Sequence, residues 1–224
     1  MATLGEYLQT WKLKLSTTKT VSAVFHLNNK EAKHKLKVNF NNKTLPFCSE
    51  PKYLGVMLDR SLTYHRNLES FCKKLTSHVA LLRQLAGSGW GAGATTLQTS
   101  TLALVHSTAH YCTPVWCHTA HTRLIDPAIN DALQIVTGCL RPIPADNLPI
   151  LASIQPAGLR RSGATLSLGR RAIEPGHRLH SVLTCPSSAV ARRLKSRHPF
   201  VTTAQQLISF SDNNNILCGV VSRS

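Results

Sequence analysis

The stretch that decides the fold is PKYLGVMLDRSLTYH, residues 51–65. Its first half, Tyr53–Leu58, is rich in residues that favour β-strands. After Asp59 the pattern changes, because apolar residues recur at intervals of three and four, as in an amphipathic helix. These residues are Leu68, Phe71, Leu75, Val79, Leu82 and Leu85. The stretch therefore marks the change from a mixed α+β part to a helical part.

The part before this stretch is predicted to hold a short helix and a small antiparallel sheet. Four apolar residues at spacings of four, three and four predict a helix over residues 2–14; they are Leu4, Leu8, Trp11 and Leu15. Residues 21–27 are predicted to be a strand. Residues 36–40 and 44–47 flank the turn residues 41–43 and predict a β-hairpin. We therefore predict a partial α+β domain over residues 1–59.

The part after the stretch is predicted to be helical. The first helix is expected to stop at Gly87 and Gly89, and a second to run over residues 94–110. Asp126-Pro127 suits a helix start and Gly138 a helix end. We predict a helical domain over 60–150, whose last residues, 141–149, are a proline-rich connector. A basic helical extension over 151–173 and a poorly ordered basic tail over 174–224, rich in Arg, Ser and Pro, are expected to follow.

The charge of the chain favours a polyanionic partner. It has 26 Lys and Arg against 10 Asp and Glu, a formal net charge of +16. Such an excess attracts nucleic acid through the field of the whole molecule and through release of counterions. No apolar run is long enough to cross a bilayer, so no membrane partner is expected. The N-terminus has neither the basic start nor the apolar core of a signal peptide. The seven cysteines are scattered without a paired framework, which indicates reduced thiols. We expect an intracellular protein of the nucleus or cytoplasm that is not secreted.

Five segments, in the same order, resemble the reverse transcriptases of non-LTR (LINE-type, jockey-like) retrotransposons. They are residues 11–20, with the pattern W-x-L-x-L-x-x-x-K-T, and residues 51–65, 85–92, 102–116 and 159–161. The resemblance covers about residues 1–161. It implies that residues 1–59 are the end of a polymerase palm and residues 60–150 a thumb-like domain. In this family the acidic turn that holds the catalytic metal lies before the part that the chain matches.

The resemblance and the charge pattern together nominate the candidate site residues. Lys19 matches a family lysine near the leaving pyrophosphate, where an ammonium group would stabilise developing charge. The turn Tyr53-Leu54-Gly55 matches the one that contacts the backbone of the growing primer end. Other basic residues are expected to contact phosphates without reading sequence; they are Arg66, Lys73, Lys74, Arg83, Arg160 and Arg161. The predicted partner is RNA or DNA, with the missing part of a longer polymerase as a second one.

The acidic residues do not suggest a catalytic centre. Two-metal nucleotidyl transfer needs carboxylates close enough to hold two ions about 4 Å apart. The closest pair, Asp126 and Asp131, is separated by five residues, about 500° of helical turn, so the two side chains point to different faces. Asp126 is better explained as a helix cap. We therefore expect no enzymatic activity of the chain by itself and no cofactor, with Mg²⁺ needed only in an intact polymerase.

Residues 110–121 carry the alternative hypothesis, a zinc-stabilised interaction module. Four candidate ligands follow the pattern C-x4-C-H-x2-H; they are Cys112, Cys117, His118 and His121. This spacing is not a usual zinc-finger pattern, and small apolar cysteines packed in a helical core with exposed histidines are the favoured explanation. A degenerate reading frame without function is the third hypothesis.

Overall fold

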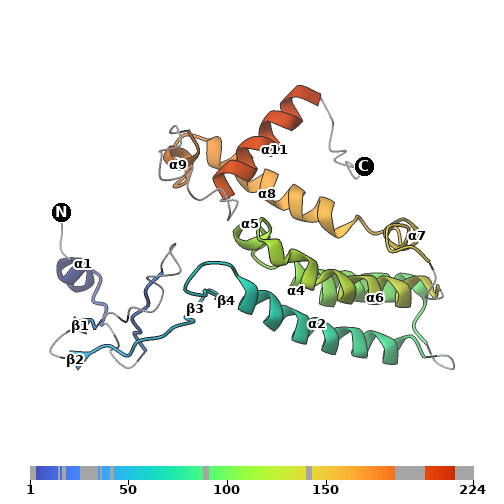
Figure 1. The fold of residues 1–224 in the computed structure, drawn as a ribbon, viewed down its shortest axis with the longest axis horizontal. Helices are drawn as coiled ribbons and strands as arrows, with labels where there is room; N and C mark the ends of the chain where they lie inside the picture. Colours follow the sequence, from blue (N-terminus) through green and yellow to red (C-terminus); the bar gives the residue numbers. More distant parts are fainter. Residues whose placement is uncertain are drawn as a thin grey trace. The chain divides into compact units, whose positions relative to one another are not determined.

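The computed structural model describes residues 4–14, 16, 19–25, 35, 37–40, 43–87, 91–139, 143–184 and 200–214. The chain forms two compact units, residues 1–66 and 67–224, which are described separately below. The fold is α+β and mostly helical, with a short N-terminal helix and small antiparallel strand pairs, as predicted (Figure 1).

The described residues of the first unit form one helix and two β-hairpins. Helix α1 spans Leu4–Thr10. Strand β1, Asn39–Phe40, pairs antiparallel with β2, Lys43–Thr44, with Asn39 opposite Thr44. Strand β3, Lys52–Tyr53, pairs antiparallel with β4, Val56–Met57. Strands β1 and β2 fall where the hairpin was predicted. The single strand predicted over residues 53–58 is instead divided into β3 and β4 by a turn at Leu54-Gly55.

The helix predicted over residues 2–14 and the strand predicted over residues 21–27 also differ from the structure. Helix α1 ends at Thr10, so Trp11 lies beyond it and is 64% exposed instead of completing an apolar face. The strand predicted over residues 21–27 is reduced to an isolated parallel bridge between Ser22 and Phe47. Leu15 and residues 26–27, which belonged to these predictions, lie outside the described residues. Apolar periodicity at the start of the chain therefore overstated the length of both elements.

The second unit is a stack of helices. Helix α2, His65–Leu85, enters it from the first unit. Helix α3, Ala94–Thr101, continues without a break into a π-helical turn, η1, Leu102–His106, and into α4, Ser107–Ala109. Shorter segments follow: α5, Thr113–Trp116; the 3₁₀ turn η2, Ala120–Leu124; α6, Asp126–Thr137; and α7, Leu148–Leu151. The last helices are α8, Ala157–Ile173; α9, His180–Thr184; and α11, Phe200–Asn214.

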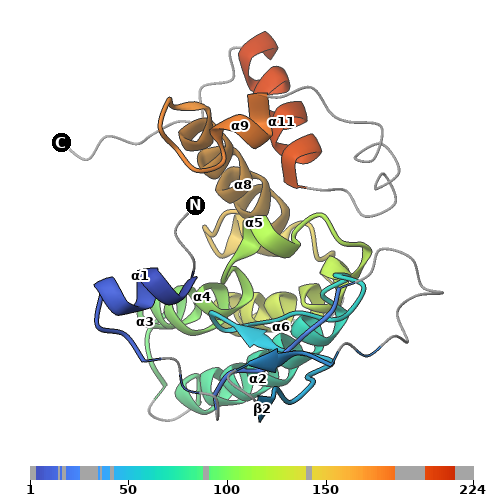
Figure 2. The ribbon, with the colours of Figure 1, turned by 90° about the vertical axis from the view of Figure 1, so that its left-hand side faces the viewer.

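The helices of this unit form successive layers (Figures 1 and 2). Helix α2 covers one side of the layer made by α3, α4 and α6, while α8 lies beyond that layer and carries α9 and α11. The core between α2 and its neighbours includes Trp116, whose ring meets that of Phe71 edge to face at 6.1 Å. The predicted apolar stripe of α2 is buried at five of its six positions, and Leu85 is the exception at 39% exposure.

Helix α6 begins and ends close to where the sequence predicted. Gly138 follows its last residue in a left-handed conformation, φ +65°, which glycine adopts without steric cost. The N-cap residue, however, is Ile125, and Asp126 is the first residue of the helix. No side chain makes a capping hydrogen bond at this end. The assignment of Asp126 as a cap was therefore wrong. No helix in the part of the chain described here is both long and apolar enough to span a membrane.

The tail predicted to be poorly ordered over residues 174–224 contains two helices in its described part, and residues 185–199 and 215–224 lie outside the described residues. Residues 180–184 and 200–214 form α9 and α11, which pack on α8 through a cluster of Ala172, Leu183 and Ala204. Ala172 and Ala204 allow close approach of the helices, and Leu179, Phe200 and Val201 pack against the cluster. The Pro, Ser, Asn and Arg content of the region had led to the prediction of disorder.

Candidate nucleic-acid interface

The β3–β4 hairpin presents the predicted primer-contacting turn. Its two-residue connection is Leu54, with φ +46°, and Gly55, with φ +84°. Positive φ at both positions is the signature of a type I′ turn, which normally prefers Asn-Gly. Tyr53 and Leu54 are 65% and 72% exposed, whereas Val56 is buried and anchors the hairpin. The turn therefore holds a bulky apolar residue at its tip in a conformation that costs energy.

Asp59 fixes the loop that leads from this hairpin into α2. Its carboxylate accepts hydrogen bonds from the backbone N–H groups of Thr63 and Tyr64, at 2.9 and 2.7 Å. It also accepts from the hydroxyls of Ser61 and Thr63. Burial alone would raise the pKa of Asp59, but the hydrogen bonds from Thr63 and Tyr64 outweigh it and keep the pKa below its usual value. Asp59 is therefore a structural residue held in its charged form.

The outer face of α2 is polar and basic. Lys73 and Lys74 are exposed and lie off the buried stripe of the helix. Neither ammonium group has an ion pair or hydrogen bond within the described parts of the chain. The hydroxyls of Thr76 and Ser77, also exposed on this helix, donate to the carbonyls of Cys72 and Lys73. The two ammonium groups are thus available to an external anion.

Three of the four arginines predicted to bind phosphates form intramolecular ion pairs. Arg66 meets Glu50 at 3.4 Å within the first unit. In the second unit Arg83 meets Asp131 at 3.5 Å, and Arg161 meets Asp126 at 2.8 Å. The Arg161 side chain is only 14% exposed, whereas those of Arg66 and Arg83 are each 58% exposed. Arg161 therefore joins α8 to α6 and is withdrawn from the interface.

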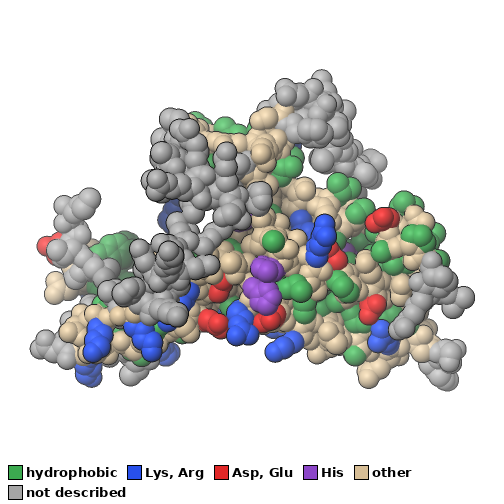
Figure 3. Space-filling view, in the orientation of Figure 1, with side chains coloured by type: hydrophobic (Ala, Val, Ile, Leu, Met, Phe, Trp, Pro, Cys, Tyr) green, Lys and Arg blue, Asp and Glu red, His purple; other side chains and the backbone are tan. Residues whose placement is uncertain are grey.

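Asp126 and Asp131 lie on different faces of α6, as predicted. Asp126 pairs with Arg161 of α8, whereas Asp131 pairs with Arg83 of α2. The view in Figure 3 shows basic side chains interspersed with acidic and hydrophobic ones. The carboxylates of Asp126 and Asp131 serve as partners for arginine. Their arrangement offers no pair of neighbouring carboxylates for two metal ions.

A buried histidine pair lies where the π-helical turn meets α4, and the sequence analysis missed it. The rings of His106 and His110 stack in parallel at 5.2 Å, and His106 is 2% exposed. Neither ring nitrogen of His106 has a hydrogen-bond partner among the described residues. Burial, followed by the charges of His110 and Arg160, lowers the pKa of His106 to about 4. The i, i+4 spacing of the histidines was the signal that could have revealed the pair.

The candidate zinc ligands are not brought together. Cys117 Sγ lies 3.1 Å from the hydroxyl of Thr165 on α8, and burial raises the pKa of its thiol. Cys112 occupies a left-handed conformation before α5. Cys117 Sγ lies 4.0 Å from Nδ1 of His118, the next residue in the chain. Across the described ranges, no three His, Cys, Asp or Glu side chains cluster as metal ligands. The geometry does not favour the zinc module.

Lys19 lies in a tight turn of the first unit, where its backbone N–H donates to the carbonyl of Ser16 at 3.2 Å. Its side chain is exposed. The proposed role of Lys19 beside pyrophosphate stays a prediction from resemblance.

The chain is similar in sequence to a curated retrotransposon protein. It is 27% identical over 162 residues to the retrovirus-related Pol polyprotein from type-1 retrotransposable element R1 4 of Nasonia vitripennis. The match takes in 65% of this chain but 41% of the relative, so the chain spans less than half of that protein's length. No family model and no solved structure matches the chain. The similarity supports a distant relation to the non-LTR retrotransposons indicated by the sequence motifs.

Proposed function

We propose, from this relation, that the chain is the thumb-side part of a non-LTR retrotransposon reverse transcriptase and binds nucleic acid through phosphate groups. The order of the motifs and the similarity to a Pol polyprotein support the ancestry. We propose that the protein acts in the nucleus or cytoplasm, where such a partner would be found. The proposed contacts are electrostatic and independent of sequence.

The observation that carries the proposal is the outer face of α2. Lys73 and Lys74 stand exposed beside the hydroxyls of Thr76 and Ser77, and their charges are not neutralised by described acidic residues. Lysine and hydroxyl side chains are typical phosphate contacts in complexes with nucleic acids. Together with the net charge of +16, this face provides a site where a phosphate backbone can displace counterions.

The β3–β4 hairpin supplies a second contact in this proposal. Its exposed Tyr53 and Leu54 would lie against the sugar and base of a primer end, and Gly55 would allow close approach of the backbone. A recessed primer end offers such apolar surface, whereas the middle of a duplex does not.

The proposal includes no catalysis by this chain alone. The acidic residues whose contacts are described serve other purposes: Asp59 holds a turn, and Asp126 and Asp131 pair with arginines. Nucleotidyl transfer would require carboxylates supplied from elsewhere in a longer polymerase.

The test is the salt dependence of binding to an RNA–DNA hybrid duplex, measured by fluorescence anisotropy between about 50 and 200 mM salt. Wild-type affinity is expected to fall steeply over this range. The double variant Lys73→Gln/Lys74→Gln should lower the slope of log K against log salt by up to about 2, since each phosphate contact contributes about 0.9.

The matched control is Lys35→Gln/Lys37→Gln, which removes the same charge from two exposed lysines of the first unit. An equal loss in both variants would show that the net charge acts without the α2 face. Affinity that does not change with salt would contradict phosphate binding altogether.

A further inference from the structure

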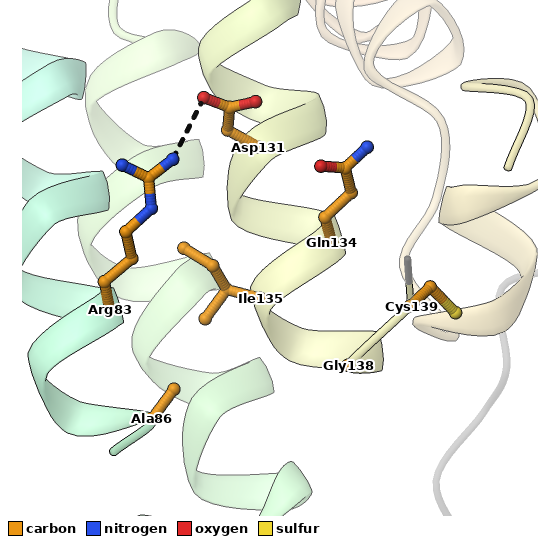
Figure 4. A pocket seen from close by; sticks show the side chains of 7 residues that line it. All are labelled: Arg83, Ala86, Asp131, Gln134, Ile135, Gly138 and Cys139. Carbon is orange, nitrogen blue, oxygen red and sulfur yellow. Dashed lines mark hydrogen bonds and ion pairs between the residues drawn. The ribbon is translucent and has the colours of Figure 1, made fainter. Parts of the chain in front are cut away.

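An open hollow of about 370 Å³ lies between the ends of α2 and α6, and Figure 4 shows its lining. Arg83 and Asp131 form one rim, and Ile135 points toward α2 beneath them. Ala86 and Gly138 line the hollow just beyond the last turns of the two helices. Gln134 and Cys139 complete the lining, with the Gln134 amide turned away from the ion pair. The hollow thus combines an apolar floor with a charged rim.

The electrostatics of the hollow disfavour a phosphate group. Both α2 and α6 end here, at Leu85 and Thr137, and a helix C-terminus carries partial negative charge on its free carbonyls. The Asp131 carboxylate adds a full negative charge. The hollow therefore favours a ligand with hydrogen-bond donors. Arg83 can in addition donate to one acceptor of the ligand that lies beside these donors.

The Arg83–Asp131 pair is open to exchange with a ligand. The two side chains are 58% and 52% exposed and their atoms meet at 3.5 Å, so the pair contributes little to stability. Asp131 keeps spare acceptor positions and Arg83 keeps spare N–H donors. The rim therefore presents a donor next to an acceptor, above a floor of Ile135 and Ala86.

We infer that this hollow binds an unpaired guanine base of a single-stranded nucleic acid, an inference that rests on the proposed nucleic-acid binding. The edge of guanine presents the acceptor O6 beside the donors N1–H and N2–H₂. Arg83 would donate to O6, and Asp131 would accept from N1–H and N2–H₂. Thymine and uracil offer only one donor on this edge, and a paired guanine has the edge occupied.

The basic face of α2 can guide the strand to this hollow. Lys73 precedes Arg83 by ten residues on the same helix, a rise of about 15 Å along its axis. Phosphates bound near Lys73 would leave the following nucleotides free to reach the hollow. Base contacts then add sequence preference to phosphate contacts that have none.

The experiment compares ten-nucleotide single strands by fluorescence anisotropy: oligothymidine, the same strand with one central guanine, and the same strand with hypoxanthine, which lacks the N2 amino group. The full chain should bind the guanine strand at least about fivefold more tightly than oligothymidine. Hypoxanthine should lose most of this gain. Parallel RNA strands separate recognition of the base from recognition of the sugar.

Asp131→Asn should abolish the preference for guanine. This change also raises the net charge by one, so the matched control is Asp146→Asn, which makes the same change at an exposed position outside the hollow. A guanine preference that survives in Asp131→Asn overturns the inference. Equal, salt-sensitive binding of all strands by the wild type overturns it while leaving the proposed function intact. Failure to bind any strand or the hybrid duplex overturns both.

Discussion

Two glycines of α8 occupy opposite environments. A Cβ atom added at Gly169 would lie 3.2 Å from Cδ1 of Ile208 and 3.3 Å from Cβ of Ala204, both on α11. A Cβ atom added at Gly163 would meet nothing within 4 Å. Gly169 thus permits the close packing of α8 on α11, whereas Gly163 only weakens the helix.

These environments predict opposite effects of substitution. Gly163→Ala should raise the free energy of unfolding by about 0.5–1 kcal/mol, since alanine is the better helix former. Gly169→Leu should lower it by about 1–3 kcal/mol, because the added side chain has no space between the helices. Urea denaturation followed by circular dichroism measures both. A Gly169→Leu variant as stable as wild type would contradict the packing of α11 on α8.

The buried His106 predicts a loss of stability in mild acid. In the unfolded chain its pKa returns to the ordinary 6.5, while in the folded protein it is about 4. The unfolded state therefore binds more protons between these values, and stability falls as the pH drops from about 6.5 to about 4. The contribution of one such group is at most about 1.4 kcal/mol per pH unit.

The measurement is the free energy of unfolding against pH for wild type and His106→Gln, whose side chain does not titrate. The variant should show a shallower decline in this window. A residual slope is expected, because burial also lowers the pKa of His110. Identical slopes in the two proteins would show that His106 is accessible to protons in the folded state.

The β3–β4 hairpin places strain where the proposed primer contact lies. Asparagine tolerates positive φ better than leucine, and Asn-Gly is the preferred type I′ pair. Leu54→Asn should therefore stabilise the hairpin, seen as slower amide hydrogen exchange at Tyr53 and Val56. The same change should weaken binding to a recessed primer end, because the exposed apolar side chain is lost.

Tyr53→Phe is the matched control, since it changes the neighbouring exposed residue but leaves the turn conformation and the apolar surface in place. It should leave both the hydrogen exchange and the binding nearly unchanged. Faster exchange in Leu54→Asn would contradict the turn geometry. Unchanged primer binding would remove the hairpin from the proposed interface.

The elements that the sequence predicted well are those with a strong apolar pattern. Five of six stripe positions on α2 are buried, and Gly138 ends α6 as expected. The prediction failed at α11, whose apolar residues Phe200, Val201 and Ala204 belong to the cluster with α8 and α9. The polar and proline-rich composition of the surrounding sequence was taken there as a sign of disorder.

The candidate site was less predictable than the fold. The exposure of Lys73 and Lys74 followed from helical geometry alone. Whether an arginine is free or paired depends on residues distant in sequence, as with Arg161, which reaches Asp126 across 35 positions. The hollow beside Arg83 likewise arises from two helices that end at the same place. Patterns in a single sequence do not reveal such contacts between residues that are distant in the chain.

At the scale of the whole molecule, the net charge of +16 predicts that salt has opposite effects on the stability of the fold and on the affinity for nucleic acid. Like charges repel one another in the compact state, and added salt screens them over a Debye length of about 10 Å at 0.1 M. The Tm of the free protein should therefore rise between about 10 and 200 mM NaCl. Over the same range its affinity for a hybrid duplex should fall, because salt reduces the gain from counterion release.

Differential scanning fluorimetry with and without the hybrid duplex tests this opposition in a single series. Without the duplex, Tm should increase with salt. With excess duplex, Tm should be highest at low salt, where binding stabilises the folded state by mass action, and should approach the value of the free protein as salt increases. A Tm of the free protein that falls with salt would show that its ion pairs, including Arg161–Asp126, outweigh the repulsion among its basic groups.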